Sequence, residues 1–280
     1  MTELSLSSAA VRTESPRLDF SVLGSLTVTR GDGFVLTPTP PKLRLLLAML
    51  ILRANQVVSA DWLIHGLWGA HPPRTAVTTL QVYISKLRRA LIGPDWRTVR
   101  GVIDTDTSGY VLRMAGHGCD YLRVRSLGQQ ARAAEASGDL AEAARLLSES
   151  LALWRGPALA DVRGGSWLNS QAKALDEELT DLRERWIGLE LQLGRHRSLV
   201  GELYRLVEEY PNWETLYHHL MIALHRSGRT ADALDIYGEM RIRFVDEYGM
   251  EPGPVSRRLH QRLLCRDPAL NDLSISQFSA

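Results

Sequence analysis

Hydrophobic and polar positions in residues 74–91, RTAVTTLQVYISKLRRAL, follow the period of an α-helix with two different faces. The apolar positions recur at spacings of four, four, three and four: Ala76, Leu80, Ile84, Leu87 and Leu91. A second stripe on another side of the helix comprises Thr75, Thr79, Val82 and Lys86, flanked by Thr78, Ser85 and Arg89. The segment contains no acidic residue, whereas a solvated helix face commonly carries Glu and Lys pairs. This second face suits the major groove of DNA, where Thr and Ser bind base edges or phosphates, Val contacts thymine methyls, and Lys and Arg bind phosphates or guanine.

The neighbouring segments make this helix the third of a small domain. Turn residues divide 18–36 into short strands, LDFSVLG, SLTVTR and FVLT. After a proline-rich break, we expect an apolar core helix at about 41–54, followed by a turn at Asn55–Val58 and a second helix capped by Ser59. The two-faced helix comes next. A hairpin at 99–113, which turns at Thr107–Ser108–Gly109, ends the domain. Strands, helix, helix, loop, helix and hairpin form the order of a winged helix-turn-helix, with the third helix as reader and the hairpin as wing.

From Asp120 onward the pattern is helical only. The expected helices are an Ala-rich pair over 131–154 broken at Gly138, a long helix at about 167–193, and shorter helices at about 196–209, 213–226, 230–248 and 254–264. Gly194–Arg195 and Gly228–Arg229 each follow a helix and stand 34 residues apart. That spacing is the period of tetratricopeptide repeats, so we expect a tetratricopeptide-like helical domain.

The predicted fold is therefore mainly α, with an α+β winged helix-turn-helix followed by an all-α domain. The expected divisions are a disordered tail at 1–16, a DNA-binding domain at 17–115, the helical domain at 116–270 and a tail at 271–280. No signal-peptide core is present, and the longest apolar run, Leu45–Leu52, is too short to span a bilayer. Cys119 and Cys265 match no metal or redox spacing, so we expect reduced thiols in a cytoplasmic protein that does not contact the membrane.

Charge is distributed unevenly along the chain. The whole protein has a net charge of +1, but residues 1–115 hold 13 Lys and Arg against 8 Asp and Glu, and residues 116–280 hold 20 against 24. A basic first part and an acidic second part indicate that only the first part approaches a polyanion.

None of the common enzyme motifs occurs in the sequence. The sequence contains no GxxxxGK loop, no GxGxxG after a strand, no HExxH, no GxSxG and no cysteine pair at zinc spacing. His218 and His219 are adjacent, and neighbours on a helix point apart, so a packing or surface role is favoured over metal binding. We therefore predict no catalytic residue, no cofactor and no metal.

Candidate DNA-contacting residues lie in the third helix, at the end of the second helix and in the wing. They are Trp68, Arg74, Thr75, Thr78, Thr79, Val82, Tyr83, Ser85, Lys86, Arg89, Thr107 and Ser108. Trp68 ends the second helix beside the loop, and two roles are equally compatible with that position. It either packs there or donates its indole N–H to a phosphate.

Several longer segments together carry a family resemblance over about residues 18–267. They are FSVLGSLTV, PPKLRLLLAMLILRANQVVSADWLIHGLWG, TTLQVYISKLRRAL, SGYVLR, LALWRGPALADV, LGRHRSLVGEL, LMIALHRSGRTADALDIYGEMR and EYGMEPGP. With these segments the chain resembles the Streptomyces antibiotic regulatory proteins, the SARP family of transcriptional activators. The resemblance implies an OmpR-type winged helix followed by a bacterial transcriptional activation domain, in the small, two-domain version of the family.

The resemblance also implies a function. Such proteins bind direct repeats in double-stranded DNA upstream of biosynthetic promoters, as homodimers or side-by-side protomers. They recruit RNA polymerase, including its sigma factor, and turn on an antibiotic or other secondary-metabolite gene cluster. Direct repeats require a head-to-tail arrangement, with successive reading helices about one DNA turn apart.

Two features depart from the family pattern. The wing carries Asp104 and Asp106, which should repel phosphate, and Thr78 stands where related winged helices often have a base-reading Arg. These departures leave Val82 and Lys86 as the expected sequence readers. Arg74, Thr79 and Arg89 are then expected to position the helix on the backbone.

Two alternatives use the same features differently. A repressor would block polymerase with the same DNA-binding domain. A scaffold would bind a protein or small molecule through its helical domain and use the winged helix only for interaction. The lack of acidic residues in 74–91 argues against the scaffold, and an enzyme is disfavoured because no catalytic constellation is found.

Overall fold

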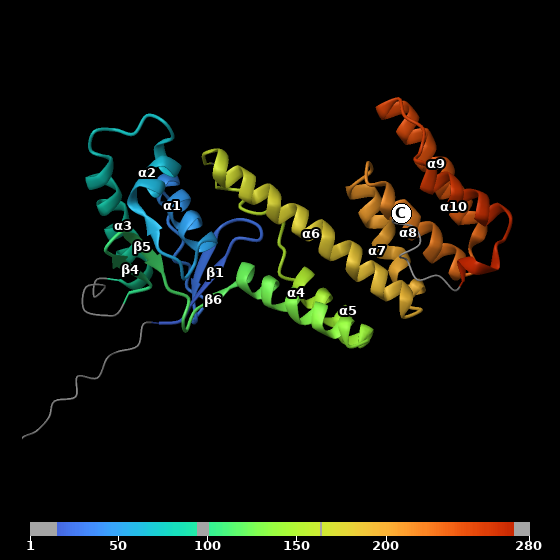
Figure 1. The fold of residues 1–280 in the computed structure, drawn as a ribbon, viewed down its shortest axis with the longest axis horizontal. Coiled ribbons are helices and arrows are strands. Elements are labelled where there is room, and N and C mark those ends of the chain that lie inside the picture. Colours follow the sequence, from blue (N-terminus) through green and yellow to red (C-terminus); the bar gives the residue numbers. More distant parts are fainter. Residues whose placement is uncertain (1–15, 94–100, 163, 272–280) are drawn as a thin grey trace, which may run out of the picture. The chain divides into compact units, whose positions relative to one another are not determined.

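The computed structural model of the protein describes residues 16–93, 101–162 and 164–271 (Figure 1). Contacts divide these residues into two compact units. The first runs to Gly128 and includes Glu149–Thr180, and the second comprises Gln129–Ser148 and the residues from Asp181. Nearly all of the two predicted tails, and the first two residues of the predicted hairpin, lie outside the described residues. The domain boundary at 115/116 stays a prediction.

The first unit contains a three-stranded sheet with the order β2-β1-β6. Its strands are β1 (Leu18–Ser21), β2 (Thr27–Arg30) and β6 (Gly118–Cys119). β1 is antiparallel to β2, with Leu18 opposite Arg30, and parallel to β6. The expected strand FVLT is wrong, because only Val35 forms a bridge, to Thr29, and its side chain stays exposed.

A second sheet in this unit has the order β3-β5-β4. It consists of β3 (Val58–Ser59), β4 (Ile103–Asp106) and β5 (Gly109–Leu112). Two expectations are corrected here: Val58 belongs to a strand, and Gly109 belongs to β5, so the hairpin turns at Thr107–Ser108 alone. A Cβ on Gly109 would lie 1.9 Å from the carbonyl oxygen of Val58, and only glycine allows the two strands to approach so closely.

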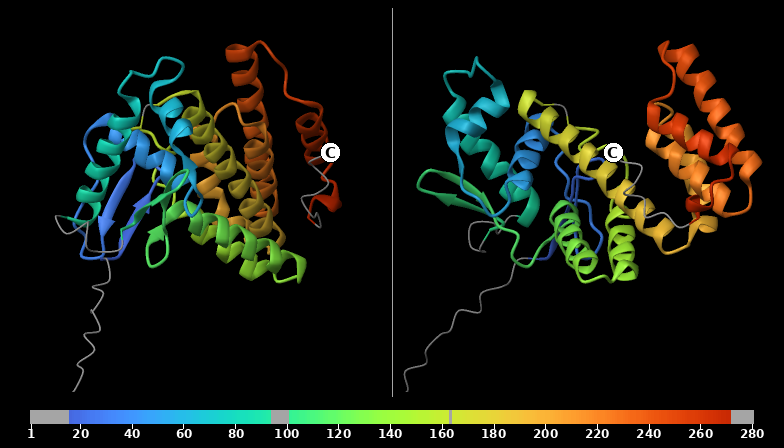
Figure 2. Two further views of the ribbon diagram at one scale, coloured as in Figure 1. Left: turned by 60° about the vertical axis from the view of Figure 1, so that its left-hand side comes forward. Right: turned by 45° about the vertical axis from the view of Figure 1, so that its right-hand side comes forward.

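Three helices complete the predicted winged-helix order: α1 (Pro41–Leu52), α2 (Ala60–Trp68) and α3 (Ala76–Ile92) (Figure 2). The apolar run makes α1 the core helix, with every residue from Leu45 to Ile51 buried. The Ser59 side chain accepts from the Trp62 N–H, which is the predicted N-cap of α2.

A segment far along the sequence completes the first unit. The backbone N–H groups of Arg155 and Leu159 donate to Leu23 and Val22 at 2.9 and 3.0 Å. The Asp120 carboxylate accepts from the N–H groups of Val22 and Leu23 at 2.9 and 3.0 Å. The segment LALWRGPALADV therefore packs along the β1–β2 connection, because its backbone N–H groups pair with carbonyl groups there that would otherwise lack a partner.

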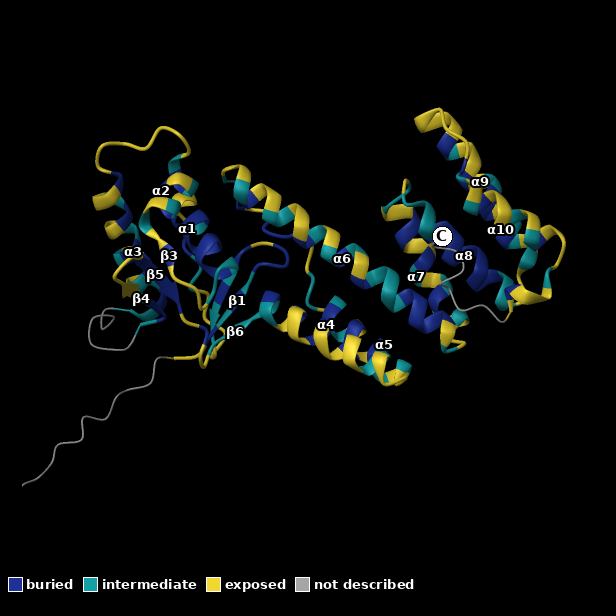
Figure 3. Cartoon of the chain, viewed as in Figure 1, coloured by how far each residue is buried: buried dark blue, intermediate teal, exposed yellow. Residues whose placement is uncertain are grey.

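The remaining helices follow the expected order, but the Ala-rich pair begins at Asp120 rather than at 131 and ends at Leu151 rather than at 154. The remaining helices are α4 (Asp120–Ala136), α5 (Leu140–Leu151), α6 (Ser166–Gln192), α7 (His196–Glu209), α8 (Glu214–Arg226), α9 (Thr230–Tyr248), α10 (Pro254–Leu264) and the short 3-10 turn η1 (Pro268–Leu270). In the second unit α8 packs between α7 and α9 and is the most buried helix, dark blue in Figure 3. Gly194 and Gly228, the residues 34 apart, both adopt positive φ, 72° and 81°. After each, an arginine N–H closes the same helix-ending bond, Arg195 to Glu190 and Arg229 to Leu224, so the sequence period reflects a repeated helix–turn–helix geometry.

Among the described residues, no helix combines the length and apolar character needed to cross a membrane.

Candidate nucleic-acid interface

The buried side of α3 is the predicted apolar stripe. Its buried residues are Ala76, Leu80, Ile84, Leu87 and Leu91. Because this stripe fixes the rotation of the helix against the core, the opposite face is directed to solvent. The helix begins at Ala76, however, so Arg74 and Thr75 lie in the preceding turn rather than in the first helical turn. Thr75 still caps the helix through its carbonyl oxygen, which accepts from the N–H of Thr79 at 2.8 Å.

The outward face of α3 carries the side chains expected there. Thr78, Val82, Lys86 and Arg89 are exposed, and Thr79, Tyr83 and Ser85 are half-buried. Sequence reasoning missed Gln81, which is also exposed. A glutamine amide pairs well with the major-groove edge of adenine. Its position three residues after Thr78 and four before Ser85 is the signal that marks it as a member of the same face.

The basic side chains of this region divide into two groups. Arg88 points back into the unit, where its guanidinium donates to the carbonyl of Ile103 at 2.9 Å and to the hydroxyl of Thr105 at 2.8 Å. Burial lowers the pKa of Arg88, and these bonds tie α3 to the wing strand β4. Arg74, Lys86 and Arg89 form none of the ion pairs found within the described residues. Their charges are therefore available for an anion.

Trp68 packs against α3. Its ring stacks on Tyr83, with ring centres 6.1 Å apart and planes 18° apart, and the Lys42 ammonium lies 6.0 Å from the Trp68 ring centre. The stack joins the end of α2 to the middle of α3 and so contributes to the angle between them. A phosphate contact by the Trp68 indole stays a prediction.

The wing tip is acidic and internally bonded. Of the two wing carboxylates, that of Asp104 pairs with Arg113 at 3.1 Å and is neutralised by it. Asp106 accepts from the backbone N–H of Ser108 and from the hydroxyls of Thr107 and Ser108, and these bonds lower the pKa of Asp106. In this conformation both hydroxyl protons are directed at Asp106. This arrangement leaves a carboxylate, rather than a free hydroxyl donor, at the wing tip.

Within the part of the chain that the structure describes, no group of three or more His, Cys, Asp or Glu side chains is arranged to hold a metal ion.

Comparison with known proteins places these features in context. Residues 36–112 match the family model "Transcriptional regulatory protein, C terminal", and residues 119–264 match the model "Bacterial transcriptional activator domain". The first match includes α1, α2, α3 and the β4–β5 hairpin, which are the elements that build the outward basic face.

Relatives align with almost the whole chain. It is 39% identical over 262 residues to Regulatory protein AfsR of Streptomyces coelicolor, covering 93% of this chain and 26% of AfsR. It is 34% identical over 262 residues to Regulatory protein DnrI of Streptomyces peucetius, covering 91% of this chain and 94% of DnrI. The solved structure of Mycobacterium tuberculosis EmbR in complex with a low-affinity phosphopeptide matches with a TM-score of 0.79 at 33% identity, covering 94% of this chain and 69% of that one. The chain spans about a quarter of the length of the AfsR proteins that it matches.

Proposed function

This chain belongs to the SARP family of DNA-binding, non-enzymatic transcriptional regulators, and we propose that it activates an antibiotic or other secondary-metabolite gene cluster. The outward face of α3 is the observation that carries the DNA-binding part of the proposal. It combines Val82 and exposed hydroxyls with unpaired basic side chains, on a helix whose rotation the core determines.

We assign reading and positioning to different residues of this face. Val82 and Lys86 lie near the middle of the exposed side and read base edges through a methyl contact and hydrogen bonds. Arg74, Thr79 and Arg89 lie toward the two ends and bind phosphates. Thr75, Thr78, Tyr83 and Ser85 add contacts between these two groups. Trp68 binds the DNA backbone through its indole N–H, whereas the wing residues Thr107 and Ser108 bind it only if their hydroxyls give up Asp106.

The assembly follows from the family. Protomers bind direct repeats upstream of a promoter side by side, in the bacterial cytoplasm, and recruit RNA polymerase through contacts that include the sigma factor. A bacterial transcriptional activator domain over residues 119–264 supports the recruiting role.

Footprinting with in vitro transcription tests the proposal. The full chain should protect a direct repeat upstream of an operon flanking its gene, and it should raise the transcript yield from that promoter with purified RNA polymerase. Protection with a lowered yield would identify a repressor. No protected repeat upstream of any neighbouring operon would refute DNA-directed regulation, and binding of a protein partner that persists in Lys86→Ala without DNA affinity would identify a scaffold.

A further inference from the structure

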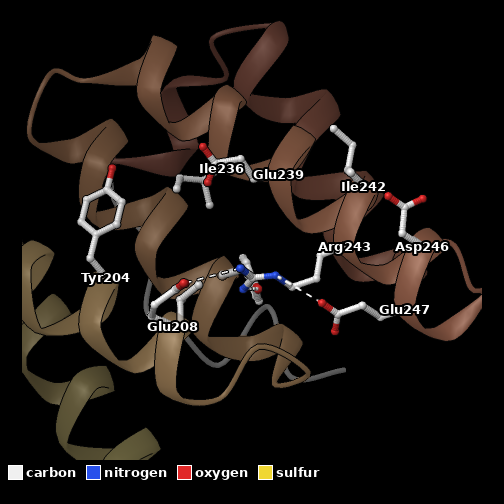
Figure 4. A pocket seen from close by; sticks show the side chains of 10 residues that line it. Tyr204, Glu208, Ile236, Glu239, Ile242, Arg243, Asp246 and Glu247 are labelled. Carbon is white, nitrogen blue, oxygen red and sulfur yellow. Dashed lines mark hydrogen bonds and ion pairs between the residues drawn. The ribbon is translucent and has the colours of Figure 1, made fainter.

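A groove in the second unit is separate from the DNA-facing helix. It has a volume of about 450 Å³ and lies over α8, with walls from α7 and α9 (Figure 4). Tyr204 and Glu208 come from α7, and Glu239, Ile242 and Asp246 come from α9. The groove is therefore built from three successive helices whose order in the sequence is also their order in space.

Apolar side chains in the walls remain in contact with water. Ile242 is 64% exposed and Tyr204 is 38% exposed, although both line the groove. Other apolar residues of this unit, such as Leu220 and Met240, are fully buried in its core. Leaving an isoleucine and a tyrosine side chain in water within a concave surface costs hydrophobic free energy, which a bound apolar group would recover.

The charges of the groove are strongly unbalanced. Its single cation, Arg243, is already occupied: it lies 3.4 Å from Glu208 and 4.0 Å from Glu247, and it donates to the Tyr217 hydroxyl at 3.1 Å. Glu239 and Asp246 take part in none of the ion pairs or side-chain hydrogen bonds found within the described residues. Four carboxylates therefore share one cation, and two of the four are free.

The free carboxylates flank the exposed isoleucine. Glu239, Ile242 and Asp246 are three and four residues apart on α9, so they follow one another along one face of the helix. Figure 4 shows Ile242 between Glu239 and Asp246 at the groove, with Tyr204 on the opposite wall. An occupant that matches this order has cationic groups at both ends of a bulky apolar group.

We propose that this groove is a docking site for a segment of a partner protein in which Lys or Arg residues flank a bulky apolar side chain. The apolar side chain packs on Ile242 and Tyr204, and the cations reach Glu239 and Asp246. Nucleic acid is excluded as the occupant because its phosphates would meet four carboxylates. The proposal goes beyond DNA binding and uses no residue of α3.

The expected affinity is modest and sensitive to salt. Ion pairs at exposed positions contribute a few-fold each and are screened, so losing both free carboxylates should weaken binding about tenfold at low salt. Loss of the apolar anchor should also weaken binding about tenfold, because a few packed apolar residues carry much of the energy of such contacts.

Selection from a random library tests this proposal without knowledge of the partner. A library of random 12-residue peptides is selected on the immobilised full chain, with counter-selection on the double variant Glu239→Lys, Asp246→Lys. The selected peptides are then measured by fluorescence anisotropy against wild type, the neutralised pair Glu239→Gln with Asp246→Asn, and Ile242→Ser. Asp181→Asn is the matched control, because Asp181 is an exposed acidic residue of the same unit that lies on α6, outside the groove and off the face of α9.

The expected result is enrichment of peptides with Lys or Arg beside Leu, Ile, Phe or Trp. Their binding should weaken about tenfold in the neutralised pair and in Ile242→Ser, and remain unchanged in Asp181→Asn. DNA affinity of all variants should equal that of wild type, which separates this proposal from the one on α3. The proposal is overturned if no peptide is enriched, if the enriched peptides lack cationic residues, or if they bind the groove variants as tightly as wild type.

Discussion

Two basic side chains of α3 are expected to do different work on DNA. Arg89 lies near the carboxyl end of the helix and Lys86 one turn earlier, and both are exposed. Arg89→Ala should weaken binding to all DNA sequences alike, because one phosphate contact is lost. The same loss should reduce the slope of the logarithm of the binding constant against the logarithm of the salt concentration by about one unit. Lys86→Ala should weaken binding and also change which sequences are preferred, by about 1–3 kcal/mol at the base it reads.

Salt titrations of DNA affinity, together with selection of preferred sites from random duplexes, measure both effects. Arg17→Ala is a suitable control, since Arg17 is a basic exposed residue of the same unit that lies outside α3. Site preferences that are identical in wild type and Lys86→Ala would contradict the reading role of Lys86.

The buried imidazole of His219 predicts a dependence of stability on pH. Burial, and secondarily the neighbouring His218, lower the pKa of His219 from 6.5 to about 4. Between these values the unfolded chain holds a proton that the folded chain does not. The free energy of unfolding should therefore fall as the pH drops from about 6.5 to about 4, by an amount on the order of 3 kcal/mol.

Urea unfolding at a series of pH values checks this expectation. In His219→Phe the free energy of unfolding should decrease less between pH 6.5 and pH 4 than in the wild type. The Nδ1 of His219 has no hydrogen-bond partner within the described residues, so an apolar ring leaves nothing unpaired there. Equal slopes for wild type and His219→Phe would assign the pH dependence to other groups. The exposed His65 provides the control His65→Gln, which should leave the slope unchanged.

At the scale of elements, one carboxylate at the start of α4 holds the connection between β1 and β2. The Asp120 oxygens accept from the N–H groups of Val22 and Leu23, whose side chains are fully buried. Burial raises the pKa of Asp120, while these bonds oppose that rise. Asp120→Ala removes the acceptor of three backbone N–H groups, those of Val22, Leu23 and Tyr121, and should destabilise the first unit by about 2–4 kcal/mol.

Denaturant unfolding of the full chain, followed by tryptophan fluorescence, measures this loss. The control Glu177→Ala removes an exposed carboxylate from the same compact unit and should change stability by less than about 0.5 kcal/mol. If Asp120→Ala is no less stable than Glu177→Ala, the carboxylate does not hold the connection.

At the scale of the whole molecule on DNA, the proposed head-to-tail arrangement makes binding depend on helical phase. Adjacent protomers must reach the same face of the duplex, so their sites are separated by about one turn, roughly 10–11 base pairs. Inserting half a turn between the repeats should abolish cooperative binding, and inserting a full turn should largely restore the arrangement on one face. Band-shift titrations on the three DNAs measure the cooperativity, and equal cooperativity on all of them would exclude side-by-side contacts.

The spacing of apolar residues along the sequence predicted those helices in which one face packs against the core. The spacing of Ala76, Leu80 and Ile84 decided which side of α3 is buried and so which side faces solvent, because a helix has a single period that the apolar residues reveal. The same reasoning placed α7 to α10 within about a residue of their observed ends. The resemblance to a family of regulators then supplied a function that periodicity cannot express.

Tertiary structure alone decided the features that depend on partners distant in the sequence. The two-residue strands β3 and β6 have no period of their own and exist because β5 and β1 provide their hydrogen bonds. Arg88 and Arg89 are adjacent and chemically identical, yet the carbonyl of Ile103 and the hydroxyl of Thr105 hold Arg88 away from the exposed face of α3. Sequence pattern records which residues avoid water, but a hydrogen bond or ion pair selects one partner among many, and only the folded chain brings that partner within reach.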